Sequence, residues 1–258
     1  MAQQSASRGA PEARTLELPP LYRAINLREH QDAFDHARAI AAEEGAGTLV
    51  WVRRFDTIEF ALIVEPEEPL STARRVLYAA MSALGDALVS YAPPEKPMAF
   101  AWPATIMFDG GIIGGGQLAW PDGATEDAVP DWLVVGFVVR GVLPAKPGGT
   151  HQLDTAAVRG TSLEAEGFEM LDQADVVASF ARHFMVYVDQ WQEKGFVPVG
   201  QVYLARLPEE RGVKRGIDVN GDLLVRRLPN LKDVERQSLV AALAAPEWRD
   251  PESGDPWL

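Results

Sequence analysis

Five glycines lie within residues 100–118 of this chain, in a stretch whose only charged side chain is Asp109. Glycine-rich segments often bind phosphate, because backbone N–H groups can approach an anion closely where no Cβ intervenes. The phosphate-loop motif places Lys and then Ser or Thr after its last glycine, whereas Gly116 is followed by Gln117. The dinucleotide motif opens a helix, whereas this stretch runs on to Pro121. Neither nucleotide motif fits the sequence.

The sequence offers little for metal or nucleophilic chemistry. It contains no cysteine, which excludes thiolate metal ligands, disulfides and cysteine nucleophiles. Its four histidines do not have the spacing of a zinc-binding helix; they are His30, His36, His151 and His183. We therefore expect no metal site and no required cofactor.

The net charge of −13 limits the partners of this 258-residue chain. Nucleic-acid binding is disfavoured, because it needs a dense basic surface and no dense basic cluster is present. No apolar run reaches the length that spans a bilayer, and the first residues lack the apolar centre of a signal peptide. We expect a cytoplasmic protein that binds neither nucleic acid nor membrane. Its oligomeric state is left open.

The spacing of apolar residues predicts where helices and strands lie. The predicted helices cover residues 29–44, 71–88, 177–194 and 231–243. The predicted strands cover residues 48–53, 58–65, 132–139, 201–207 and 216–226, with a further pair in 100–118 joined at Asp109. Residues 144–170 are predicted to form a long irregular connection. Because strands and helices segregate along the chain, we expect an α+β fold in which helices pack on a mixed or antiparallel sheet.

The chain is long enough to bury one sizeable core with a small addition. We expect residues 1–19 to form a disordered N-terminal tail. Residues 20–207 are predicted to form the main α+β domain. Residues 208–258 are predicted to form a small, mostly β C-terminal domain, made of a hairpin and a short helix.

Several short motifs, read in chain order, resemble the catalytic module of the biotin and lipoate protein ligases. The family has a Lys-Trp-Pro-Asn-Asp strand, an Asp-Gly turn, a glycine-containing strand, a Val-Val-Gly-Ile-Gly-Ile-Asn strand and an Ala-Thr-Ser-Leu segment before a long helix. The segments that resemble these are Ala101-Trp-Pro-Ala-Thr105, Asp109-Gly110, Ile113-Gly-Gly-Gly-Gln117, Val134-Val-Gly-Phe-Val-Val-Arg140 and Gly160-Thr-Ser-Leu163. The resemblance covers about residues 20–227 and implies the family's fold.

The resemblance also implies a ligand groove along the glycine-rich strand, where missing Cβ atoms let a bound acyl or ureido group lie close to the backbone. Biotin, lipoate or ATP are the ligands that it suggests. The candidate substrate-binding residues are Arg53, Arg54, Trp102, Gly114, Gly115, Gly116, Gln117 and Arg140. Alternatives stay open for most of them: the arginines could form ion pairs, Trp102 could belong to the core, and Gly114 and Gly116 could relieve crowding against a helix.

The sequence departs from the family at the positions that carry its chemistry. The lysine before Trp-Pro, which stabilises charge as the acyl-adenylate forms, is replaced by Ala101. A second family lysine falls at Ile112, and the Asn-Asp pair becomes Ala104-Thr105. The family's Gly-Arg-rich loop is replaced by a direct connection at residues 53–56. No catalytic residue can therefore be assigned.

Three functions are compatible with these observations. The first is a diverged family member that binds a small carboxylate, acyl or cofactor-like ligand, or a carrier-type protein, without ATP-dependent ligation. The second is an active biotinyl, lipoyl or acyl transferase with relocated catalytic groups, for which Lys146 is the candidate lysine. The third is an interaction protein whose groove is filled by its own side chains.

Overall fold

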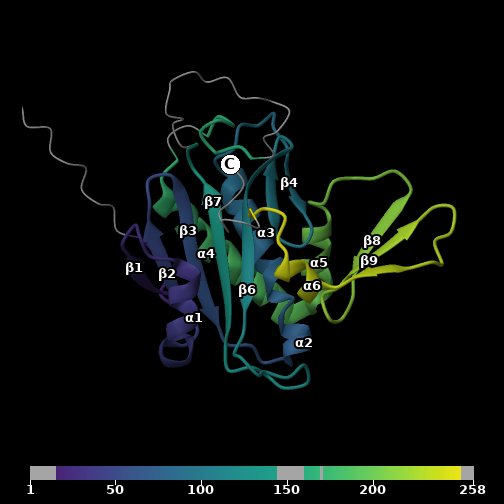
Figure 1. The fold of residues 1–258 in the computed structure, drawn as a ribbon, viewed down its shortest axis with the longest axis horizontal. Coiled ribbons are helices and arrows are strands. Elements are labelled where there is room, and N and C mark those ends of the chain that lie inside the picture. Colours follow the sequence, from purple (N-terminus) through teal and green to yellow (C-terminus); the bar gives the residue numbers. More distant parts are fainter. Residues whose placement is uncertain (1–15, 144–159, 169–170, 251–258) are drawn as a thin grey trace, which may run out of the picture.

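A seven-stranded sheet forms the centre of the computed structural model, which describes residues 16–143, 160–168 and 171–250 (Figure 1). Its strand order is β1-β2-β3-β7-β6-β5-β4. Neighbouring strands are antiparallel except β1 and β2, so the predicted mixed sheet is confirmed. The strands are β1 (Arg23–Leu27), β2 (Thr48–Arg53), β3 (Thr57–Val64), β4 (Met98–Ala101), β5 (Thr105–Phe108), β6 (Gly111–Ala119) and β7 (Leu133–Arg140).

One face of this sheet, here called the helical face, packs on α3 (Val76–Val89), α4 (Gln173–Lys194) and α5 (Phe196–Leu204). Figure 1 shows α3 and α4 behind the sheet. Phe60 of β3 and Phe180 of α4 meet there with ring centroids 4.8 Å apart. Almost all of α3 is buried, because it lies between the sheet and α4, which explains its continuous apolar sequence.

The opposite face, here called the α1 face, is covered over β2, β3 and β7 by α1 (Ala33–Glu44). Ala33, Ala37 and Ala41 are spaced by four residues and are fully buried, so a small-residue stripe lets the helix approach the strands. The helix starts four residues later than predicted, because Asp32 caps it by accepting a hydrogen bond from the Asp35 N–H at 2.8 Å. Over β5 and β6, no helix formed by the described residues packs on this face.

The long helix α4 confirms the amphipathic pattern of the sequence. Asp172 caps its first turn, and Gly195, with φ of +77°, ends it as predicted. None of the described helices, α4 included, is long and apolar enough to cross a membrane.

A second sheet of three strands, β10-β9-β8, follows α5 and projects to one side in Figure 1. Its strands are β8 (Val213–Ile217), β9 (Leu223–Arg227) and β10 (Glu235–Gln237), and α6 (Leu239–Ala244) follows. The predicted hairpin is confirmed, with Asp218 accepting hydrogen bonds from the N–H groups of Asn220 and Asp222 at 2.9 Å. Whether a domain boundary falls at residue 207 stays a prediction.

Four local predictions were wrong. Residues 201–207 are mostly helical, because Val199 and Tyr203 lie on the side of α5 that is buried in the core. Residues 231–243 contain a strand and a six-residue helix in place of one helix. The parallel strand β1 was missed, and the predicted helix at 71–88 is divided into α2 (Leu70–Ala73) and α3, neither of which has a side-chain cap. The predicted connection at 144–170 lies largely outside the described residues.

The backbone at Gly114 answers part of the question raised by the glycine-rich stretch. The pairing register between β5 and β6 shifts beside this residue, because β6 contains one extra residue there relative to β5. Gly114 has φ of +151°, and a Cβ at this position would lie 2.0 Å from the carbonyl oxygen of Val138. The bulge therefore requires glycine.

This requirement predicts a large stability difference between two glycines in strands. Gly114→Ala should lower the free energy of unfolding by about 3 kcal/mol, through backbone strain and the clash with β7. Gly216→Ala in β8 should change it by less than about 0.5 kcal/mol, because nothing lies within 4 Å of its Cβ position. Urea denaturation measures both, and equal effects would contradict this account of the bulge.

Candidate ligand groove

Strand register decides which candidate residues share a face. Gly115 pairs with Val138, Gln117 with Gly136, and Thr57 with Arg140. Directly paired residues point to the same side of a sheet, and Gly136 lies under Phe34 of α1. Gly115, Gln117 and Arg140 therefore all belong to the α1 face.

A continuous cross-strand row runs over this face. Ala101 pairs with Thr105, Thr105 with Gly115, Gly115 with Val138, and Val138 with Glu59. The row places Ala101, at the position of the family's lysine, two strands from Gly115. From β4 to β3, the row runs from Ala101 to the buried carboxylate of Glu59, which is 4% exposed.

Glu59 and Arg54 form the charged end of the row. Glu59 accepts a hydrogen bond from the Ala33 N–H at 2.8 Å, at the start of α1, and its carboxylate lies 3.0 Å from a guanidinium nitrogen of Arg54. Burial raises the pKa of Glu59, and this effect outweighs the Ala33 hydrogen bond and Arg54, which both lower it. Arg54 is thus engaged in a salt bridge, the alternative that the sequence left open.

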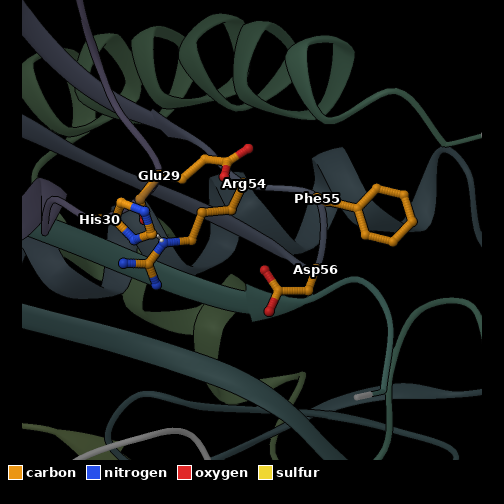
Figure 2. Close-up of a pocket in the computed structure, with 5 residues that line it drawn as sticks. All are labelled: Glu29, His30, Arg54, Phe55 and Asp56. Atoms are coloured by element: carbon orange, nitrogen blue, oxygen red, sulfur yellow. Dashed lines mark hydrogen bonds between the residues drawn. The ribbon is translucent and has the colours of Figure 1, made fainter. Parts of the chain in front are cut away.

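Arg54 also closes the short turn between β2 and β3. It donates hydrogen bonds to the backbone carbonyls of Glu29 at 2.8 Å and Gln31 at 3.1 Å. Figure 2 shows it beside His30, while the exposed ring of Phe55 points away. A hollow of about 460 Å³ lies beside this turn, lined by Glu29, His30, Arg54, Phe55 and Asp56.

Arg140 lies at the end of β7, as predicted, and only 4% of it is exposed. Its strand neighbour across the sheet is Thr57, which is two residues from Glu59 on the same face. Arg140 and Glu59 are therefore diagonal neighbours in the sheet. This places a buried positive charge beside the row.

The ring of Trp248 covers the centre of the row. Trp248 is fully buried and packs with Ile112, Val138 and Met107. A Cβ at position 115 would lie 2.3 Å from Cδ1 of the indole, so the ring rests directly on the backbone of Gly115. The guanidinium of Arg249 lies 4.7 Å from the centre of the same ring. The space above Gly115 is thus filled by the chain's own C-terminal segment.

The remaining candidate residues are not part of this face. Arg53 is exposed and lies over Trp51, 5.8 Å from its ring centre, on the helical face. Trp102 donates a hydrogen bond to the hydroxyl of Tyr78 at 3.0 Å and packs against the main core. A Cβ at Gly116 would lie 2.9 Å from the ring of Phe137 and 3.2 Å from Sδ of Met81, so this glycine faces α3. Whether any candidate binds a ligand stays a prediction.

Two residues of the groove were not found from the sequence. Glu59 was predicted only as part of the strand at residues 58–65, although the apolar residues on both sides of it indicate a buried strand. Trp248 stands alone in the polar segment Pro-Glu-Trp-Arg-Asp, and a large aromatic residue in such a segment was the available signal. Only long-range packing shows where its ring lies.

A larger groove of about 1270 Å³ lies elsewhere, on the helical side between α4 and the ends of β3 and β7. Phe184, Trp191, Leu62 and Leu133 contribute to its lining. It is not bordered by the glycine-rich strand. Among the described residues, no group of three or more His, Asp or Glu could hold a metal ion.

The seven-stranded mixed sheet with its packed helices is the fold of the biotin-ligase-like proteins. Residues 18–205 match the Biotin/lipoate A/B protein ligase family, and the chain belongs to this family. It is similar to a biotin (acetyl-CoA-carboxylase) ligase of Paracoccus denitrificans, with 24% identity over 206 residues, which cover 74% of this chain and 82% of that protein.

Two solved structures support the same conclusion. A biotin protein ligase-like protein of unknown function from Silicibacter sp. superposes with a TM-score of 0.73 and 25% identity, covering 88% of this chain and 98% of that one. The biotin protein ligase of Aquifex aeolicus superposes with a TM-score of 0.63 and 14% identity, covering 84% and 95%, which shows a shared fold.

The raised pKa of Glu59 predicts how stability depends on pH. The folded protein holds a proton at Glu59 more tightly than the unfolded chain, whose carboxyl has the ordinary pKa of 4.5. This contribution to stability is therefore full below pH 4.5 and is lost as the pH rises through the raised pKa. Because Glu59→Gln cannot titrate, wild type should lose stability relative to this variant as the pH rises from 4.5 to 7.

Urea midpoints at several pH values measure this difference. Glu43→Gln is the matched control, since Glu43 is exposed on α1 and should leave the pH profile unchanged. A Glu59→Gln variant whose pH profile is parallel to that of wild type would contradict the prediction.

Proposed function

We propose that this protein is a diverged member of the biotin/lipoate ligase family that does not perform ATP-dependent ligation. Its groove on the α1 face would bind a small carboxylate, acyl or cofactor-like ligand, or part of a carrier-type protein. One observation carries the proposal: the row through Gly115 has Ala101 in place of the family's lysine, and the second lysine position, Ile112, packs under Trp248.

Loss of these positive charges would lower the rate of acyl-adenylate formation. Acyl-adenylate formation develops negative charge that preorganised donors must stabilise, and loss of one such donor typically costs about 10²–10³ in rate. Here two lysine positions hold apolar side chains. The turn at residues 54–56 also joins β2 to β3 directly, so it leaves no room for a loop that could fold over an adenylate.

The positive charges that remain support ligand binding better than catalysis. Arg54 is occupied by Glu59 and two backbone carbonyls. The backbone of Arg140 is held by a central strand, and a guanidinium at the end of such a strand has the geometry for bidentate recognition of a carboxylate. Lys96, another lysine in the described part of the chain, is paired with Glu166 at 2.6 Å. Lys146 lies outside the described residues.

The first test is ligation itself. The purified protein should not transfer biotin or lipoate to a carrier domain when ATP and Mg²⁺ are supplied, and Ala101→Lys alone should not restore transfer. Streptavidin blotting and anti-lipoyl detection measure the product, with an active biotin ligase as the positive control. Modification above background by the wild-type protein would contradict the proposal and favour the transferase with relocated catalytic groups.

The second test concerns the carboxylate anchor. Arg140→Met keeps most of the side-chain volume and removes the charge, so the affinity for biotin or lipoate should fall about tenfold or more, because a charge-assisted pair is lost. Isothermal titration calorimetry measures the affinity.

Arg53→Met is the matched control for this test. Arg53 is exposed on the helical face, so its substitution should leave the affinity unchanged. A thermal unfolding curve shows whether each variant is folded. An unchanged affinity in folded Arg140→Met would reject the role of Arg140 in binding.

A further inference from the structure

The segment after α6 returns to the centre of the main sheet. Figure 1 shows it in yellow, running from the small sheet toward β6. Among residues 240–250, Trp248 is the only buried residue, and its neighbours are exposed or half-buried. The segment is therefore anchored on the α1 face by one side chain, which rests on Gly115, Ile112 and Val138.

Two polar side-chain atoms of this segment lack hydrogen bonds. The indole Nε1 of Trp248 and the Nε of Arg249 are both buried without a hydrogen-bond partner. Buried polar groups in proteins are nearly always hydrogen-bonded, and an unpaired donor disfavours the docked state. The ring is therefore held on this surface by apolar contacts, and its Nε1 contributes no hydrogen bond to the docked state.

The docked ring also occupies the position that a ligand of the glycine strand would need. Trp248 lies against the backbone of Gly115 and against Ile112, which together form the middle of the groove. Arg249 is near enough to Glu59 to lower the pKa of that carboxyl, so the segment reaches across to the charged end of the row. Ring and ligand cannot occupy this space together.

We propose that Trp248 is an intramolecular occupant of the ligand groove, and that a ligand reaches Gly115 only after the segment 246–249 has left. This inference rests on the proposed function, because it concerns access to the same groove. The indole indicates what the opened space accepts: a flat, largely apolar ring system that contacts the bare backbone of Gly115 and can accept a hydrogen bond.

Thiol labelling tests, without any ligand, whether Trp248 controls access to this surface. The chain contains no cysteine, so a single Ile112→Cys places the only thiol under Trp248. In the Trp248→Ala background, a maleimide should label this thiol at least tenfold faster than in the background with Trp248. Ile106→Cys, fully buried on the helical face, is the matched control and should be labelled at the same slow rate in both backgrounds.

Two labelling results would overturn the proposal. If Trp248→Ala leaves the labelling of Ile112→Cys unchanged, Trp248 does not control access to the groove. If it accelerates both thiols equally, Trp248 is a core residue whose loss loosens the whole fold. Hydrogen exchange on the wild-type protein gives a second measurement, in which amides of residues 246–249 should exchange faster than those of β6. Equal protection of the two segments would also reject the proposal.

Binding of two defined probes, biotin and lipoate, separates this inference from the proposed function. An occupant that is docked in nine of ten molecules or more reduces apparent affinity at least tenfold. Trp248→Ala should therefore bind a probe at least tenfold more tightly than wild type. Trp132→Ala, which removes a half-buried indole at the far end of β7, should not change the affinity.

The possible results distinguish the displacement of Trp248 from the proposed ligand binding. Equal affinity in wild type and Trp248→Ala would overturn the displacement while supporting a ligand groove. Faster labelling of Ile112→Cys in the Trp248→Ala background without binding of either probe would support Trp248 as the occupant of this surface and contradict the proposed ligand class.

Discussion

The antiparallel pairing of β7 with β3 on one side and β6 on the other is the constraint on which the rest of the structure depends. A shift of one residue in either register would exchange every side chain between the two faces. In the observed register, Phe137 enters the core with Phe60 and Phe180, while Val138 meets Gly115 on the α1 face. The same pairing thus builds the core and aligns the groove.

This alignment explains why the three consecutive glycines have three different environments. Gly114 is a bulge residue that only glycine can occupy, Gly116 faces α3, and Gly115 alone faces the groove. The three glycines therefore do not share one face of the sheet in this protein. The central glycine determines how closely a ring, whether of a ligand or of Trp248, can approach the sheet.

The family fold is present in this chain with apolar residues at the two positions where the resemblance implies lysines. The sheet, the long helix α4 and the glycine strand are retained, and their superposition on biotin protein ligases shows that the framework does not require those lysines. Function is carried by side chains placed on a fold, so a retained framework does not by itself retain chemistry. In this chain the ring of Trp248 packs on Ile112, one of those two positions, and on Val138 beside it.

Local sequence patterns were sufficient to predict the strands, turns and helices that depend on short-range interactions. The sequence predicted the strands β2 and β3, the Asp-Gly turn, and the apolar stripe of α4 with Gly195 at its end. It also predicted the family and the position of Arg140 at the end of a buried strand. Tertiary packing decided the rest. Residues 201–207 form mostly helix because Tyr203 is buried among core aromatic rings, and Arg54 pairs with Glu59 because a short turn brings them together. The contact of Trp248 with Gly115 joins residues far apart in the chain, and no local pattern encodes such a contact, since it depends on the path of the whole backbone between them.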